Sequence, residues 1–248
     1  MSATESGAQA GTDSEVRVRV EGLGKTFRLF KEGQDPTTLP VFGQIALDVC
    51  SGECVVLSGA SGVGKSTLMR AVYGNYLPTE GRVYVMHEGE FVDIASCPPR
   101  QLLEVRRRTL GFVSQFLRVI PRIPTIQLVM EPLLENGAGE DEARARAEAL
   151  LAKLALPSRL WALPPATFSG GEQQRVNIAR SFAASKPVML LDEPTASLDA
   201  DNRAIVIELI RDALAQGVAM LGIFHDQAVR DAVATRLFDV EDAARAAA

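Results

Sequence analysis

The chain has 248 residues, of which 47% are hydrophobic and 23% charged, a composition that is typical of a globular protein with a sizeable core. Its formal net charge of -5 argues against an overall basic surface for nucleic acid. No apolar run approaches the roughly 20 residues of a membrane span, and residues 1–13 lack the features of a signal peptide, so we expect a disordered tail there.

The first predicted strands are recognised by the alternation of apolar and polar residues. Residues 16–20 alternate between valine and arginine and predict a half-buried strand, which residues 25–30 extend. The polar stretch 31–40 contains two prolines and predicts a loop. A second strand is expected over residues 41–49.

The three cysteines are Cys50, Cys54 and Cys97. An odd, sparse set is not a disulfide framework, and no second pair follows that would complete a metal site. We therefore expect buried, reduced thiols and a cytoplasmic protein.

A glycine-rich loop follows the apolar strand 54–58 and precedes a predicted helix over 67–73. It matches the pattern G-x-x-x-x-G-K-[ST], in which backbone N–H groups surround the phosphates of a nucleotide. Lys65 would reach the terminal phosphates, and the hydroxyl of Ser66 suits Mg²⁺, which prefers oxygen ligands. The pattern predicts a nucleoside triphosphate site formed by Gly59, Ala60, Ser61, Gly62, Val63, Gly64, Lys65, Ser66 and Thr67.

The middle of the chain changes from strand to helix patterns. Residues 81–94 predict a β-hairpin, in whose turn we expect His87 to be exposed. Residues 98–108 predict a helix whose three terminal arginines form a solvated face, with binding of a partner or nucleic acid as the alternative. A strand then ends at Gln115, and residues 116–165 indicate a helical insert within an α/β core.

Two further apolar runs end in chemically active side chains. Residues 188–193 end in Asp192 and Glu193, and residues 218–225 end in His225. Active-site residues of open α/β sheets lie where the strands end. We expect Asp192 to hold Mg²⁺ through water, Glu193 to polarise an attacking water, and His225 to face the terminal phosphate.

The start of another helix carries a second possible anion site. Ser169 and Glu172 have the spacing of a capping box. A cap does not need Gly170 and Gly171, which would expose backbone N–H groups at the helix N-terminus. Because one phosphate loop needs only one such site, we expect the second to serve a nucleotide that another chain holds.

These motifs resemble, in order and over nearly the whole chain, those of the ATP-binding cassette (ABC) ATPases. The matching positions are the phosphate loop, Gln115, the signature 168–172, the acidic strand end 188–193, Asp199 and His225. The resemblance implies an α/β fold with a RecA-like parallel-sheet core, an antiparallel β subdomain and an inserted α-helical subdomain. Residues 14–240 would form one domain, with the nucleotide-binding core in 14–115 and 186–240 and the helical subdomain in 116–185.

The same resemblance implies the chemistry. Two subunits would enclose two ATP molecules, with Glu193 as the catalytic base and Gln115 as a sensor and Mg²⁺ ligand. By position, Phe27 would stack on adenine, and Glu172 and Asp199 would join the nucleotide-binding residues. The chain departs from many members at Phe168 and Glu172, where leucine and glutamine are common, but its Ser-Gly-Gly centre is intact.

Four stretches resemble, more specifically, PhnL, the ABC subunit of the carbon–phosphorus lyase systems that break down phosphonates. They are residues 73–78, 114–123, 167–180 and 222–226. This implies a cytoplasmic ATPase whose partners are lyase core subunits, bound through residues 116–123, and a second cassette, identical or related. Neither nucleic acid nor membrane insertion is implied.

The alternatives are the ATP-hydrolysing subunit of a membrane transporter, similar to lipoprotein-releasing exporters, and a non-transport ABC protein that acts on nucleic acid. The first alternative is favoured by the likeness of the sequence after Gln115. The second usually has two cassettes in one chain, whereas this chain has one.

Overall fold

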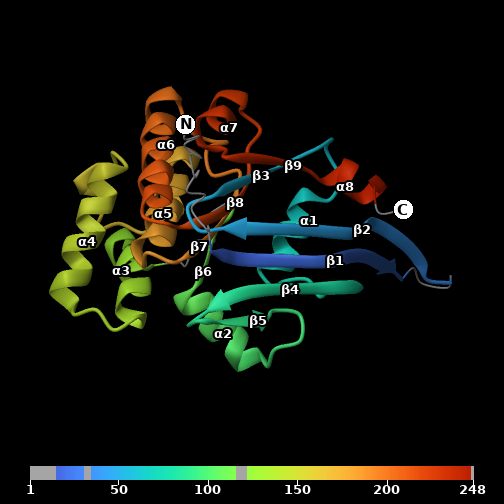
Figure 1. Ribbon diagram of the computed structural model, residues 1–248. Helices are drawn as coiled ribbons and strands as arrows, with labels where there is room; N and C mark the ends of the chain where they lie inside the picture. The colour runs from blue at the N-terminus through green and yellow to red at the C-terminus, as the bar shows by residue number, and fades with distance from the viewer. Residues whose placement is uncertain (1–14, 31–34, 116–121, 247–248) are drawn as a thin grey trace, which may run out of the picture.

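The computed structural model describes residues 15–30, 35–115 and 122–246 (Figure 1). The predicted tail at residues 1–13 lies outside the described residues, as do 31–34 and 116–121. An antiparallel sheet has the strand order β2-β1-β4-β5, formed by β1 (Val16–Leu29), β2 (Thr37–Cys50), β4 (Glu80–His87) and β5 (Glu90–Asp93). A parallel sheet has the order β6-β7-β8-β3-β9, formed by β3 (Cys54–Ser58), β6 (Leu110–Val113), β7 (Val188–Asp192), β8 (Ala219–Ile223) and β9 (Arg236–Asp239).

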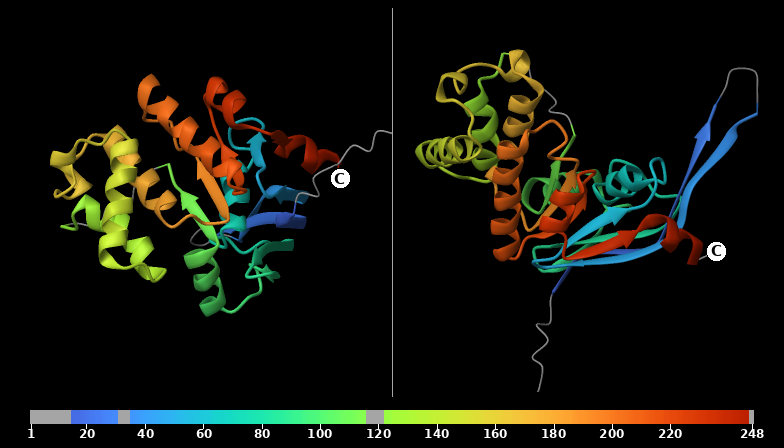
Figure 2. Two further views of the ribbon diagram at one scale, coloured as in Figure 1. Left: turned by 60° about the vertical axis from the view of Figure 1, so that its left-hand side comes forward. Right: turned by 90° about the horizontal axis from the view of Figure 1, so that it is seen from above.

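The long pair β1 and β2 corrects the last four residues of the loop that was predicted over residues 31–40. Strand β2 begins at Thr37, and Pro40 lies opposite Thr26 of β1. Strand β2 is at the edge of its sheet, so the missing N–H of proline removes no hydrogen bond to a further strand. The outer end of this pair extends away from the rest of the molecule (Figure 2).

The β4–β5 hairpin is confirmed, but the prediction of an exposed His87 is wrong. His87 is 9% exposed, and its Nδ1 lies 2.6 Å from the hydroxyl oxygen of Thr109. The cause is the pleat of β4: Val83, Val85 and His87 point to the same, buried face because side chains alternate along a strand.

The parallel sheet separates two hydrophobic cores. On β3, Val55 and Leu57 face the antiparallel sheet, whereas Cys54 and Val56 face the opposite core. Strand β3 is hydrogen-bonded to β8 and β9 on its two sides, so it is buried on both faces and both edges. Burial raises the pKa of the Cys54 thiol to about 12, which keeps this thiol protonated and unreactive.

The helices divide between the two cores (Figures 1 and 2). Helices α1 (Lys65–Val72) and α2 (Pro99–Arg108) pack on the side of the antiparallel sheet. The other core is covered by α3 (Thr125–Glu135), α4 (Glu140–Lys153), α5 (Gly170–Ala183), α6 (Ala200–Ala215) and α7 (Gln227–Val233). Two 3₁₀ turns (Ser158–Leu160 and Pro165–Thr167) precede α5, and α8 (Val240–Ala246) follows β9. Within the described residues, no helix has both the length and the apolar character needed to cross a bilayer.

Candidate functional site

The phosphate-loop motif lies between the end of β3 and the start of α1, as its sequence pattern predicts. Gly64 immediately precedes α1 with a φ of 105°, and a Cβ at this position would lie 2.6 Å from a methyl group of Val41. Only glycine fits this approach of the loop to β2. Lys65 folds back over the loop, and its Nζ donates to the carbonyl oxygens of Gly59 at 2.8 Å and Ala60 at 2.9 Å.

Ser66 and Asp192 bring two oxygen donors together beside this loop. The hydroxyl of Ser66 donates to Oδ1 of Asp192 at 3.5 Å. Asp192 ends β7 and is 6% exposed, and burial raises the pKa of its carboxyl group although the nearby Arg70 opposes the shift. A buried carboxylate next to a hydroxyl fits a hard divalent cation such as Mg²⁺, because the cation would offset the cost of burying the charge.

Three strand ends converge on Glu193. Its Oε2 accepts a hydrogen bond from Nε2 of Gln115 at 3.2 Å, and its Oε1 lies 2.7 Å from Nε2 of His225. Its own N–H donates to the carbonyl of Ile223 at 3.0 Å, and its φ of 52° turns the chain away from β7. The structure thus gathers the predicted residues Gln115, Glu193 and His225, which follow β6, β7 and β8, around one carboxylate.

The capping box at the start of α5 is present. The N–H of Glu172 donates to Oγ of Ser169, and the Glu172 carboxylate accepts from the Ser169 backbone at 2.9 Å and from its hydroxyl at 2.8 Å. These hydrogen bonds lower the pKa of Glu172. A Cβ at Gly170 would meet nothing within 4 Å, so this helix start has an open side. Among the described residues, no hydrogen bond or ion pair joins Ser169–Glu172 to the phosphate loop.

Phe27 and Asp199 are the two remaining predicted residues. The ring of Phe27 meets the ring of Tyr76 edge-on, with centroids 5.5 Å apart, and Nζ of Lys25 lies 4.8 Å from the Phe27 centroid. Asp199 caps α6 by accepting from the N–H of Asn202 at 2.9 Å, and hydrogen bonds from Asn202 lower its pKa. Among the described residues of this single chain, no hydrogen bond or ion pair joins Phe27 or Asp199 to the phosphate loop.

Sequence reasoning missed two polar residues that support the site. Buried Gln174 and Asn177 of α5 donate to the carbonyl oxygen of Ser114, next to Gln115, at 3.4 and 2.7 Å. Gln174 also donates to the carbonyl of Pro194, next to Glu193, at 3.0 Å. Their spacing of three residues, which places both on one helix face, was the available signal.

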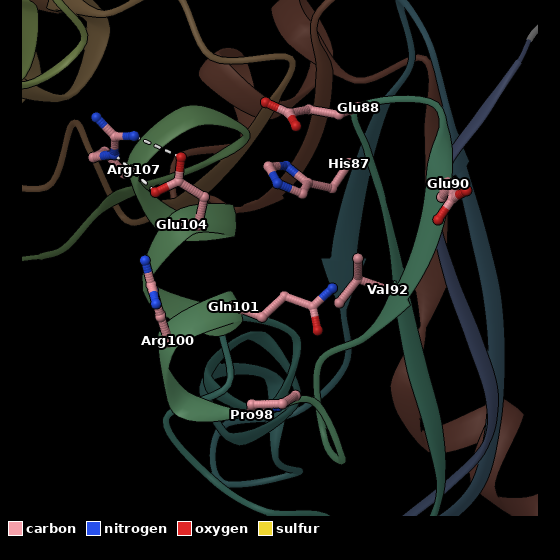
Figure 3. Close-up of a pocket in the computed structure, with 9 residues that line it drawn as sticks. All are labelled: His87, Glu88, Glu90, Val92, Pro98, Arg100, Gln101, Glu104 and Arg107. Carbon is pink, nitrogen blue, oxygen red and sulfur yellow. Dashed lines mark hydrogen bonds and ion pairs between the residues drawn. The ribbon is translucent and has the colours of Figure 1, made fainter.

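A hollow of about 760 Å³ lies apart from these residues, between the β4–β5 hairpin and α2 (Figure 3). Its walls include Glu104 and Arg107, which are joined by an ion pair across one turn of α2. None of its lining residues belongs to the phosphate loop or to the strand ends around Glu193.

The three arginines at the end of α2 are half-buried or exposed, and each also contacts another group of the chain. Arg106 donates to the carbonyl of Tyr73 at 3.1 Å, Arg107 pairs with Glu104, and Arg108 pairs with Glu88 at 2.8 Å. Each of the three guanidinium groups thus has a partner within the chain.

Proteins of known type resemble this chain in sequence and in fold. The family model described as ABC transporter matches residues 42–196. The lipoprotein-releasing system ATP-binding protein LolD of Xylella fastidiosa is 39% identical over 211 residues, which are 85% of this chain and 84% of LolD. The macrolide export ATP-binding/permease protein MacB of Brucella melitensis is 38% identical over 225 residues, which are 91% of this chain but only 33% of MacB, so the chain spans about a third of that relative.

Among solved structures, the dimeric post-hydrolysis state of the ATP-binding cassette MJ0796 bound to ADP and Pi has 29% identity and a TM-score of 0.80. The match covers 91% of this chain and 95% of that structure. A second dimeric structure of MJ0796 gives a TM-score of 0.79. The predicted ABC ATPase fold, with a parallel phosphate-loop core and an antiparallel β sheet, is confirmed. The chain belongs to the ABC transporter family, as one of its ATP-binding cassettes.

Proposed function

We propose that this chain binds ATP with Mg²⁺ and hydrolyses it as one of the two cassettes of a dimer. The observation that carries the proposal is the convergence of Gln115, Glu193 and His225 beside the phosphate loop. A carboxylate at this place can accept a proton from a water that attacks the terminal phosphate. Gln115 and His225 hold that carboxylate from its two sides and so keep it oriented.

The phosphate loop would bind the triphosphate through its backbone N–H groups and Nζ of Lys65. Ser66, Gln115 and Asp192 would hold Mg²⁺, which neutralises phosphate charge when bound. The raised pKa of Asp192 supports this set, because a buried carboxyl group gains most from a cation beside it. Phe27 would stack on the adenine, and its partly buried ring beside Tyr76 offers an aromatic surface for that role.

The signature residues would act on the nucleotide of the second cassette. The open side of Gly170 and the lack of described contacts between Ser169–Glu172 and the chain's own phosphate loop support this arrangement. The MJ0796 cassette with ADP and Pi is likewise a dimer. Asp199, at the start of α6, would lie at the same junction.

The names of the relatives favour a membrane permease as the partner that the dimer drives. LolD is the ATP-binding protein of a lipoprotein-releasing system, and MacB combines ATP-binding and permease parts in one protein. We take a transporter ATPase as the first candidate for the biological role.

A second candidate role is that of a PhnL-like subunit of a carbon–phosphorus lyase assembly. It is favoured by the four stretches quoted above, residues 73–78, 114–123, 167–180 and 222–226, which lie largely outside the shared ATPase motifs. The partner would then be lyase core subunits. The segment 116–123 would contact the partner in either role; its residues 116–121 lie outside the described residues.

The hydrolysis is tested with Glu193→Gln. We expect ATP binding to persist and turnover to fall by roughly two orders of magnitude or more, because the general base is lost. Glu208→Gln, an exposed change on α6, is the matched control and should keep full turnover. Unchanged turnover of Glu193→Gln would show that the base lies elsewhere.

The partner is tested by isolating the tagged full chain from its native cells with and without ATP. Co-purification with an integral membrane permease supports the transporter role. Co-purification with lyase subunits from the fraction without membranes, together with failure of deletion cells to grow on a phosphonate as sole phosphorus source, supports the lyase role. Normal growth on phosphonate contradicts the lyase role.

A further inference from the structure

Arg203 of α6 joins two loops that follow different strands. Its Nη1 donates to Oδ2 of Asp226 at 2.5 Å, and its Nη2 donates to the carbonyl oxygen of Leu198 at 3.0 Å. Leu198 lies in the segment between β7 and α6, whereas Asp226 lies between β8 and α7. The planar fork of the guanidinium suits this role, since its two end nitrogens point at separate acceptors.

Asp226 is fixed on its other side as well. Its Oδ1 caps α7 by accepting from the N–H groups of Ala228 at 2.8 Å and Val229 at 3.2 Å. One carboxylate therefore ties the start of α7 to α6. Because His225 is the preceding residue, this tie also restrains the backbone from which the His225 ring extends.

The segment after Glu193 is equally well ordered by its backbone. The N–H of Ala196 donates to the carbonyl of Glu193 at 3.3 Å, and the N–H of Leu198 donates to that of Thr195 at 3.2 Å. These two bonds make a compact turn from Glu193 to Leu198. Its neighbour Ser197 approaches the signature helix, since a Cβ at Gly171 would lie 3.0 Å from the Ser197 carbonyl oxygen.

The contacts form a closed ring. It runs from Glu193 through the turn to Leu198, across Arg203 to Asp226, and through His225 back to Glu193 at 2.7 Å. The backbone bond from the Glu193 N–H to Ile223 joins the two segments where their strands end. Farther from the reacting groups, Arg203 joins the same two segments again and so closes the ring.

We propose that Arg203 is a positioning residue that holds His225 against Glu193 by bridging Leu198 and Asp226. The inference deepens the proposed function and rests on Glu193 as the catalytic base. It also connects the signature helix to the strand ends through the turn that carries Ser197. An ordinary surface ion pair is the competing explanation, because the side chains of Arg203 and Asp226 are 32% and 33% exposed.

Three variants separate positioning from ordinary stability. Arg203→Met keeps the apolar stem of the side chain and removes both donors. Asp226→Asn keeps an acceptor for the α7 cap but places an amide against Arg203. Arg211→Met is the matched control: Arg211 lies on the same helix and donates to the carbonyl of Ala232 at 2.9 Å, away from Glu193.

We expect Arg203→Met and Asp226→Asn each to lower kcat by about 10- to 100-fold, the range that a displacement of about 1 Å produces. The KM for ATP and the calorimetric affinity should stay within about twofold, since no group of the phosphate loop changes. The double variant should be no worse than Arg203→Met alone, because that single variant already removes the contact with Asp226. Arg211→Met should keep wild-type kcat.

Hydrogen exchange provides a readout that does not need turnover. In the nucleotide-free chain, Arg203→Met and Asp226→Asn should speed exchange in both segments 194–199 and 224–229, and Arg211→Met in neither. Unchanged kcat, or faster exchange in only one segment, overturns the bridge. If the wild-type protein had no ATPase activity, the proposed function would be wrong. The hydrogen-exchange result would still show whether Arg203 bridges the two segments.

Discussion

Substitution of Gly170 by aspartate should separate the folding of the cassette from its pairing. Gly170 is the first residue of α5, and a Cβ there would meet nothing within 4 Å, so the monomer has room for the new side chain. A negative charge in the first turn of a helix stabilises it by about 0.3–1 kcal/mol. Gly170→Asp should therefore leave the monomer at least as stable as the wild type.

In the dimer the same carboxylate would face the terminal phosphate of the partner's nucleotide. At a separation of about 4 Å and an effective dielectric constant of about 20, two unit charges repel by about 4 kcal/mol. Each such contact weakens association by roughly a thousandfold. We expect Gly170→Asp to abolish ATP-dependent dimerisation at micromolar protein and to leave ATP binding by the monomer unchanged.

The assay is light scattering after gel filtration with Mg²⁺ and ATP, in a Glu193→Gln background that preserves the nucleotide. Gly139→Asp is the control, because Gly139 precedes α4, likewise has nothing within 4 Å of its Cβ position, and should leave dimerisation intact. Dimerisation of Gly170→Asp at wild-type concentration would refute the reasoning. Loss of ATP binding by the monomer would show instead that the glycine serves the chain's own nucleotide.

Three further substitutions test separate parts of the chain. Lys65→Ala should lose most ATP affinity by calorimetry while its circular dichroism stays native, because the hydrogen bonds of this side chain to described residues go to loop carbonyls; near-wild-type affinity would contradict the phosphate role. Burial lowers the pKa of Lys186 from its ordinary 10.5 to about 8. Between about pH 8 and pH 10.5 the unfolded chain therefore binds more protons at this residue than the folded chain does, and the free energy of unfolding rises with pH. Lys186→Met should therefore raise the urea midpoint at pH 7, with a gain that shrinks towards pH 10; a gain independent of pH would rule out this cause. Arg122→Glu should weaken partner association in the co-purification and spare ATP binding, whereas undiminished association would exclude Arg122 from that interface.

Local patterns predicted the elements whose signals are local. The strand 54–58, the phosphate loop and the following helix are adjacent in sequence, and the capping box of Ser169 and Glu172 spans four residues, so nearby residues alone determine them. The strand at Thr37–Pro40 depends instead on its place at a sheet edge, which the sequence around Pro40 does not reveal. His87 was judged from its place beside a turn, although the pleat decides which face it occupies.

Part of the site could be predicted because the carboxyl ends of parallel strands meet at one edge of the sheet. That rule predicted that Asp192, Glu193 and His225 lie near the phosphate loop, and the contact between Glu193 and His225 agrees with it. The place of Gln115 came from resemblance to a family and not from spacing. Arg203 carried no local signal, because its acceptors lie in two other segments and a single arginine on a helix resembles a solvated residue.

The pairing of β3 affects how the protein can be made in a cell. The strand that leads into the phosphate loop pairs through Val55 with both Leu221 of β8 and Arg236 of β9. A ribosome must therefore synthesise the chain beyond Ala219 before this strand has either neighbour, and until then its apolar side chains and free edges are open to aggregation. Nucleotide cannot assist folding at that stage, because a ligand stabilises only a state whose site is formed. A nascent or truncated chain that ends before Ala219 should therefore need a chaperone rather than ATP to remain in solution.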